Sequence, residues 1–273
     1  MMTAETRHVA VRGGSIAVHV AGEGPPLLFI HGFPLDHRMW AFQSPLSDVA
    51  TLVMPDLRGF GGSLGASPIG SIRQLADDCA AVIAAIAPGE RAVACGLSMG
   101  GYVAEHLAVH HSEIVRGLVL VDTRIEADTE AARAGRRDLA ERVARVGSRI
   151  AAEAMVPKLL APTCDQRQRS PIAESLHRMI LEADPATIQQ ALAALADRPD
   201  MTEPMRSVRL PTLLVVGEED SITPPEVMRS ITTVMPQANL AVLPRCGHMT
   251  PMEDPDGFNR LVRDFLSGIP AAT

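Results

Sequence analysis

The chain has 273 residues, of which 47% are hydrophobic and 21% are charged, and its formal net charge at pH 7 is −7. This is the composition of an ordinary globular protein, and the length predicts one domain that carries a sizeable insertion. The negative charge, without any basic run, argues against binding to the phosphate backbone of nucleic acids.

Neither export nor insertion into a membrane is expected. Residues 1–14 contain Glu5, Arg7 and Arg12 and no apolar stretch, which is unlike a secretory leader. No segment reaches the roughly 18 uninterrupted apolar residues that a transmembrane helix needs. The cysteines are scattered without Cys-x-x-Cys or zinc-binding spacing, so free thiols in a cytoplasmic protein are expected.

Short apolar segments alternate with longer segments of helical periodicity along the chain. The strands expected are 16–21, 27–30, 51–54, 92–95, 118–121, 212–216 and 240–243. They are rich in Val, Leu and Ile without polar alternation, as is typical of strands that are covered on both faces. The sequence therefore predicts the α/β class, with a mostly parallel central sheet flanked by helices.

Three capping signals predict where helices begin. Ser71 is followed three residues later by glutamine, and Thr223 is followed by proline and then, three residues later, by glutamate; both are capping-box patterns. Asp254 precedes Pro255 at the start of a last amphipathic segment.

The segment 124–208 differs from the rest of the chain. It is rich in Ala, Arg, Glu and Leu, contains no strand-like run, and lacks Phe, Trp and Tyr. Its Leu and Met content makes a fully solvated surface a poor interpretation. We expect a helical cap at 124–208 that covers a core domain made of residues 1–123 and 209–273.

The strongest chemical signal is the sequence GLSMGG at 96–101, directly after the predicted strand 92–95. In a strand, Gly-x-Ser-x-Gly, helix arrangement the serine lies in a tight, strained turn at a helix N-terminus. The glycines are needed because a Cβ would collide with neighbouring backbone. Ser98 is therefore the candidate nucleophile.

A serine hydroxyl needs a base that takes its proton. Of nine histidines, His31 and His248 follow the carboxyl ends of predicted strands, where open α/β sheets form active sites. His248 follows the last strand by a short loop and is the predicted base. We interpret His31 as a residue that shapes its loop.

The base needs a carboxylate that orients it. Asp220 follows the predicted strand 212–216 and is the preferred candidate. Glu218 and Glu219 stand beside it, and Asp122 ends another strand, so these remain alternatives. Both aspartates respect the chain order Ser, Asp, His of this type of site.

An oxyanion also needs donors, each worth roughly 3 kcal/mol. The backbone N–H groups of Met99, after the nucleophile, and of Phe33, in the sequence HGFP at 31–34, are the expected donors. Leu97 and Trp40 are candidates for the substrate pocket, although Trp40 fits the core equally well.

Taken together, these motifs resemble the α/β-hydrolase superfamily. The matching segments are HGFP at 31–34, DLRGFGGS at 56–63, GLSMGG at 96–101, GEED at 217–220 and GH at 247–248. The resemblance implies the α/β-hydrolase fold, a cap domain, a triad and an oxyanion hole at the residues named above. The segments 96–102 and 36–40 are similar to the esterase and lactonase branch, which includes 3-oxoadipate enol-lactonases.

We therefore expect a hydrolase of a small-molecule carboxylic ester or lactone. A serine at the turn excludes the carboxylate nucleophile of haloalkane dehalogenases and epoxide hydrolases. A cap without aromatic residues favours a small or aliphatic acyl group. A carbon–carbon bond hydrolase, with Arg124 as a cationic donor, and a non-enzymatic ligand receptor remain alternatives.

No Walker loop, dinucleotide fingerprint or metal-binding pattern is present in the sequence. We predict catalysis without a cofactor and without a metal ion, so that activity survives chelation. The sequence indicates no particular oligomeric state.

Overall fold

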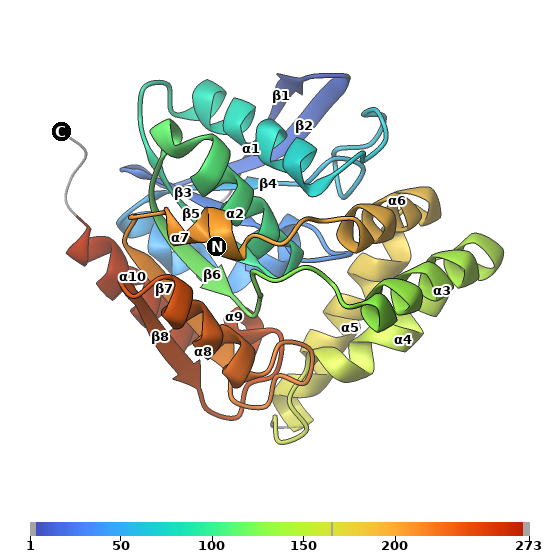
Figure 1. The fold of residues 1–273 in the computed structure, drawn as a ribbon. Coiled ribbons are helices and arrows are strands. Elements are labelled where there is room, and N and C mark those ends of the chain that lie inside the picture. The colour runs from blue at the N-terminus through green and yellow to red at the C-terminus, as the bar shows by residue number, and fades with distance from the viewer. Residues whose placement is uncertain (1–3, 165, 270–273) are drawn as a thin grey trace.

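An eight-stranded sheet lies at the centre of the structure, a computed structural model that describes residues 4–164 and 166–269 (Figure 1). The strands of this region are β1 (Glu5–Val11), β2 (Gly14–Ala21), β3 (Pro26–Ile30), β4 (Thr51–Pro55), β5 (Ala92–Leu97), β6 (Val115–Val121), β7 (Thr212–Gly217) and β8 (Ala238–Leu243). Their order in the sheet is β1-β2-β4-β3-β5-β6-β7-β8. The pairs β1–β2 and β2–β4 are antiparallel, and the other neighbours are parallel.

The central strands explain why the α/β class was predictable. Every residue of β3, β5 and β7 is buried, because helices cover both faces of the sheet there. The predicted fold class is thus confirmed. The sequence does not predict β1, because most of its residues are exposed at the antiparallel edge and it has no apolar run.

Helices cover the sheet on both faces (Figure 1). The flanking helices are η1 (His37–Asp48), α1 (Ile72–Ile86), α2 (Met99–His110), η2 (Ser112–Ile114), α8 (Pro225–Val234), α9 (Thr250–Glu253) and α10 (Pro255–Gly268). α1 and α2 pack against each other, and α10 packs against η1. None of the helices in the described part of the chain is long and apolar enough to cross a membrane.

Between β6 and β7 the described residues form helices and no strand. These are α3 (Glu130–Val146), α4 (Arg149–Leu159), α5 (Gln166–Glu182), α6 (Pro185–Ala196) and α7 (Thr202–Arg206). Figure 1 shows α3 to α6 projecting together from one side of the sheet. We call residues 124–208 the cap segment.

Two of the three predicted caps form. The Ser71 side chain accepts a hydrogen bond from Gln74 N at 3.1 Å, and Asp254 accepts one from Gly257 N at 3.0 Å. The cap predicted at Thr223 is wrong: α8 begins two residues later, and the Thr223 hydroxyl donates to Asp220 at 2.5 Å. A hydroxyl that donates to a buried carboxylate makes a charge-assisted hydrogen bond, which is stronger than a hydrogen bond between neutral groups.

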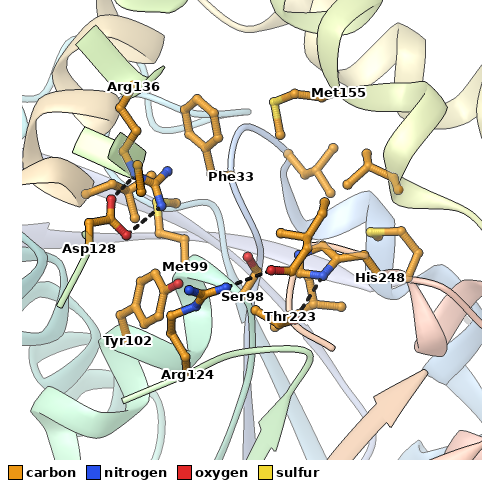
Figure 2. A pocket seen from close by; sticks show the side chains of 17 residues that line it. Phe33, Ser98, Met99, Tyr102, Arg124, Asp128, Arg136, Met155, Thr223 and His248 are labelled. Carbon is orange, nitrogen blue, oxygen red and sulfur yellow. Dashed lines mark hydrogen bonds and ion pairs between the residues drawn. The ribbon is translucent and has the colours of Figure 1, made fainter. Parts of the chain in front are cut away.

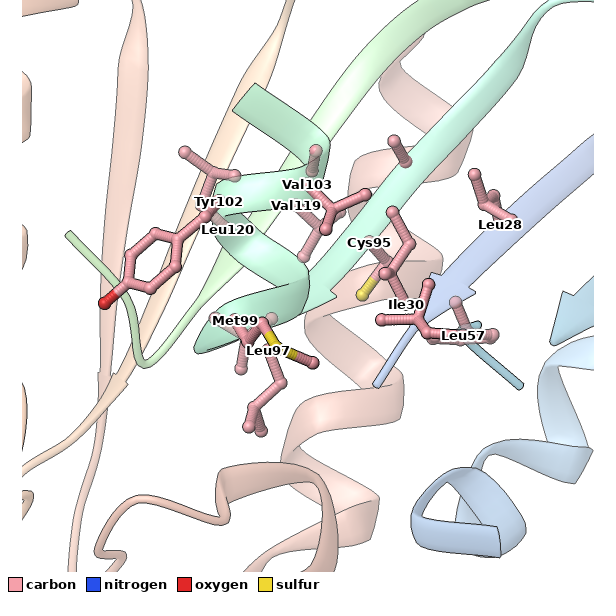
Figure 3. Packing of buried hydrophobic residues seen from close by; sticks show 14 of the residues in the cluster. Leu28, Ile30, Leu57, Cys95, Leu97, Met99, Tyr102, Val103, Val119 and Leu120 are labelled. Carbon is pink, nitrogen blue, oxygen red and sulfur yellow. The ribbon is translucent and has the colours of Figure 1, made fainter. Parts of the chain in front are cut away.

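The core holds the turn between β5 and α2 in place. Figure 3 shows Leu28 on β3 and Val119 on β6 on either side of Cys95 on β5, together with Met99 and Val103 of α2. These side chains are almost fully buried. Burial of each side chain stabilises the fold by about 1.5–3 kcal/mol. The close packing of these side chains holds residue 98, between β5 and α2, in a fixed position.

Candidate active site

Ser98 occupies the turn between β5 and α2. Its φ is 53°, a left-handed conformation that is uncommon for residues other than glycine. A Cβ on Gly96 would lie 2.0 Å from Gly100 O, and a Cβ on Gly100 would lie 2.0 Å from Ile30 O. The turn therefore requires both glycines, as predicted, and it places Ser98 at the N-terminus of α2.

His248 and Asp220 are in direct contact. The distance from His248 Nδ1 to Asp220 Oδ2 is 2.8 Å, and each residue is 3% exposed. Asp220 follows β7 and also accepts hydrogen bonds from the backbone N–H groups of Ile222 and Thr223, at 2.8 and 3.0 Å. The carboxylate is thus fixed while it faces the imidazole, which leaves Nε2 of His248 for another partner.

The two groups shift each other's pKa. Burial by itself lowers the pKa of His248, but the adjacent Asp220 carboxylate, together with Asp122 and Glu253, outweighs it, so the pKa is raised. Burial by itself raises the pKa of Asp220, and His248 together with the Thr223 hydroxyl and N–H outweighs it, so the pKa is lowered. The site therefore favours a carboxylate beside an imidazole that takes a proton readily.

A cavity of about 260 Å³ lies between the core and the cap segment. Ser98 and His248 line it together with the predicted oxyanion donors Phe33 and Met99 (Figure 2). Two other predicted pocket residues also line it: Leu97 from β5 of the core, and Arg124 at the start of the cap segment. From α3, α4 and α6 it is lined by Ala132, Arg136, Met155, Leu159 and Leu195.

The alternative carboxylates have other partners. Asp122 accepts hydrogen bonds from Gly217 N at 2.9 Å and from Thr250 Oγ1 at 2.7 Å, and burial raises its pKa. Glu218 accepts a bond from Arg245 N at 3.3 Å, and Glu219 contacts Thr163 of the cap segment. Asp122 thus ties together the segments that carry Asp220 and His248, and the geometry favours Asp220 as the partner of His248.

His31 connects two loops. Its Nε2 accepts a hydrogen bond from Leu57 N at 2.9 Å, so Nδ1 carries the proton and donates to Gly32 O at 2.9 Å. Full burial lowers the pKa of His31. These bonds fit the interpretation of His31 as a residue that shapes the loop carrying Phe33.

The structure corrects the expectation for Trp40. This side chain is 1% exposed and does not line the cavity. Its ring lies 4.7 Å from that of Phe29 and 6.3 Å from that of Phe258, measured between centroids. η1 turns Trp40 toward the sheet and α10, which is the core alternative that the sequence left open.

Replacing Trp40 by alanine is therefore expected to lower the free energy of unfolding by about 3–5 kcal/mol, because it leaves a large cavity in the core. Trp40→Phe, which keeps an aromatic ring there, is expected to lose much less. Circular dichroism in a urea titration measures both free energies. Tryptophan fluorescence cannot be used, because Trp40 is the one tryptophan of the chain and both variants lack it. An unfolding free energy unchanged in Trp40→Ala would contradict the assignment to the core.

Four polar residues of the cavity were missed by sequence reasoning: Tyr102, Asp128, Arg136 and Thr223. Tyr102 stands one helical turn after Ser98, a spacing that could have revealed it. Asp128 and Arg136 belong to the cap segment, whose position over the core is not encoded in any local pattern.

Three side chains of metal-binding type lie together outside the cavity. His19, His37 and Asp56 offer ligand atoms within 4.8 Å of one another. Asp56 already accepts four hydrogen bonds, from His37 Nδ1, His19 Nε2 and the backbone N–H groups of His37 and Gly62. The two imidazole rings are stacked with centroids 3.4 Å apart.

These hydrogen bonds give the cluster a structural role, because they hold β2 and η1 to the loop after β4.

Catalysis without a metal ion stays a prediction. We expect ester hydrolysis to be unchanged after dialysis against EDTA; loss of activity that one added metal restores would contradict it.

Comparisons with known proteins agree with this fold. Residues 27–261 match the model of the family described as "Alpha/beta hydrolase family". A thermophilic esterase from Thermogutta terrifontis has a similar structure, with a TM-score of 0.90 and 38% identity over 97% of this chain and 98% of that one.

Two curated relatives show the range of reactions nearby. A pimeloyl-[acyl-carrier protein] methyl ester esterase of Nitrosospira multiformis is 26% identical over 252 residues, which cover 89% of this chain and 95% of that protein. A 2-hydroxymuconate semialdehyde hydrolase of Pseudomonas sp. is 28% identical over 275 residues, which cover 97% and 95%. One of these relatives is named for a methyl ester and the other for a semialdehyde.

Proposed function

The chain belongs to the alpha/beta hydrolase family, and from that premise we propose that it cleaves a carboxylic ester or lactone through Ser98, His248 and Asp220. The observation that carries the proposal is the 2.8 Å contact between His248 Nδ1 and Asp220 Oδ2, together with the cavity that His248 and Ser98 both line. The similarity to the Thermogutta terrifontis esterase supports it.

In the proposed reaction, Ser98 Oγ attacks the carbonyl carbon while His248 takes its proton. The oxygen that becomes negative accepts hydrogen bonds from the N–H groups of Met99 and Phe33. His248 then returns the proton to the leaving alcohol oxygen, and an acyl-enzyme remains. Water, activated by His248, hydrolyses it and regenerates Ser98. Asp220 holds the imidazole in the tautomer that both steps need.

The cavity supports a small or aliphatic acyl group. Its volume of about 260 Å³ is at the low end for ligand pockets. Phe33 and Tyr102 are the aromatic residues that line it, and both come from the core. The cap segment contributes aliphatic side chains, Met155, Arg124 and the pair of Asp128 and Arg136.

A carbon–carbon bond hydrolase is the second candidate function. Arg124 lines the cavity, as that hypothesis expected, and the Pseudomonas relative bears the name of such an enzyme. Its substrates would be cleaved by the same three residues. An assay with a ring-cleavage product beside the esters separates the two.

Hydrolysis of p-nitrophenyl esters from acetate to laurate tests the proposal, together with a series of simple lactones. We expect turnover that is highest for short acyl groups. Turnover of the ring-cleavage product alone would favour the second candidate, and tight ligand binding without any turnover would favour a receptor.

The pH dependence follows from the raised pKa of His248. Protonated His248 cannot take the proton of Ser98, so kcat/KM is expected to fall as pH decreases through that pKa, above the ordinary value of about 6.5. Measurement of kcat/KM from pH 5 to 9 checks this. An acid limb below pH 6 in the wild type would contradict the assignment.

A further inference from the structure

Arg124 presents a positive charge to the cavity without a carboxylate partner among the described residues. Its Nη2 donates a hydrogen bond of 2.7 Å to Ile222 O, a neutral acceptor. This bond fixes the guanidinium at the wall of the cavity, and the remaining N–H groups are not used by any described residue. An arginine in such a place is suited to a planar anion.

A second group lies beside it. The hydroxyl of Tyr102 has no hydrogen-bond partner among the described residues, although the whole residue is only 4% exposed. Its ring is held by Arg198, whose guanidinium carbon lies 4.2 Å from the ring centroid. Tyr102 is thus a fixed donor at the cavity wall.

The surrounding charges add to the effect of Arg124. The Asp128 carboxylate lies between Arg136 Nε, at 2.5 Å, and Arg198 Nη1, at 2.6 Å, so one negative charge faces two positive ones. Of the charged side chains that line the cavity on this side, two are arginines and one is an aspartate. The wall therefore favours an anionic ligand.

The position of this wall relative to Ser98 indicates which part of a substrate meets it. Figure 2 shows Tyr102, Arg124 and Asp128 on one side of Ser98, with Thr223 and His248 on the other. In acyl transfer the leaving oxygen receives its proton from the histidine, so the leaving group lies toward His248. The acyl group then extends toward Arg124 and Tyr102.

On the basis of the function proposed above, we propose that Arg124 and Tyr102 bind a carboxylate at the far end of the acyl group, so that the preferred substrates are half-esters of short dicarboxylic acids. The guanidinium of Arg124 donates hydrogen bonds to both carboxylate oxygens, and the Tyr102 hydroxyl donates to one of them. Neutral esters of the same length leave the charge of Arg124 without a carboxylate partner in the cavity.

A matched pair of substrates tests this. Monomethyl adipate and methyl hexanoate differ only in a carboxylate or a methyl group at the end of the acyl chain, and a pH-stat measures their hydrolysis. We expect wild-type kcat/KM to favour monomethyl adipate by about 10- to 100-fold, as one charged hydrogen-bonded contact allows. In Arg124→Gln this ratio should fall toward one, and Arg124→Lys should retain part of it.

Arg137→Gln is the matched control. Arg137 also lies on the cap segment, but its side chain is 58% exposed, pairs with Glu130 and does not line the cavity. It should leave the ratio unchanged. An equal rate on both esters in the wild type, or a ratio that survives in Arg124→Gln, would overturn the proposal.

A binding measurement separates this proposal from the proposed function. Calorimetric titration with adipate and with hexanoate needs no turnover. Adipate binding that Arg124→Gln abolishes would support the carboxylate site even if neither ester were hydrolysed. The absence of hydrolysis would then contradict the proposed ester hydrolysis and not the carboxylate site. Adipate affinity that is the same in Arg124→Gln as in the wild type would overturn the carboxylate site even if both esters were hydrolysed.

Discussion

Ser98→Ala is expected to abolish hydrolysis of every substrate of the cavity, with a decrease in kcat of about 10⁶-fold, as observed when a catalytic serine is removed from other hydrolases. Without Oγ no acyl-enzyme forms, and His248 has no proton to take. The oxyanion donors and the cavity remain, so a small residual rate over water is expected.

The variant should fold like the wild type. Alanine keeps the Cβ, so the left-handed backbone at this position is strained to the same extent in both proteins. Equal thermal unfolding midpoints check the fold, and mass spectrometry after a fluorophosphonate label checks the nucleophile, with one label on the wild type and none on Ser98→Ala. Wild-type activity in Ser98→Ala would mean that another residue attacks the carbonyl.

Asp220→Asn is expected to lower kcat by about 10⁴-fold with little change in KM. The amide fits where the carboxylate was and can still accept hydrogen bonds from Ile222 N and Thr223 N. Its NH₂ group then donates to His248 Nδ1, which moves the imidazole proton to Nε2. In that tautomer His248 cannot take the proton of Ser98.

Asp122→Asn is the matched control, because both aspartates are buried and both follow a strand of the sheet. Asp122 bonds to Gly217 N and Thr250 Oγ1 and makes no hydrogen bond to His248. Its replacement should therefore reduce kcat far less than that of Asp220, although it weakens the tie between the two loops. Steady-state kinetics of both variants decide; a larger loss in Asp122→Asn would make Asp122 the partner of the base.

Local patterns in the sequence determined several parts of this protein. The buried strands were visible as runs of Val, Leu and Ile, and the helix starts at Ser71 and Asp254 as capping residues. The turn at Ser98 was visible because its glycines and the flanking strand and helix are neighbours in the chain. His248 was selected by its place after a strand. All of these depend on interactions within a few residues, which the order of amino acids records directly.

The tertiary structure decided what depends on segments far apart in the chain. Asp122 and Asp220 both follow parallel strands, and only the paths of the loops after β7 and β8 show which one meets His248. The sequence allows Trp40 in the core or in the pocket, and the packing of η1 against the sheet places it in the core. The sequence also allows Thr223 as a helix cap, but its hydroxyl donates to Asp220.

The wall formed by Tyr102, Arg124 and Asp128 depends in the same way on how the cap segment lies over the core. Burial and charge pairing between distant segments are collective properties of the packed chain, and no short window of sequence contains them.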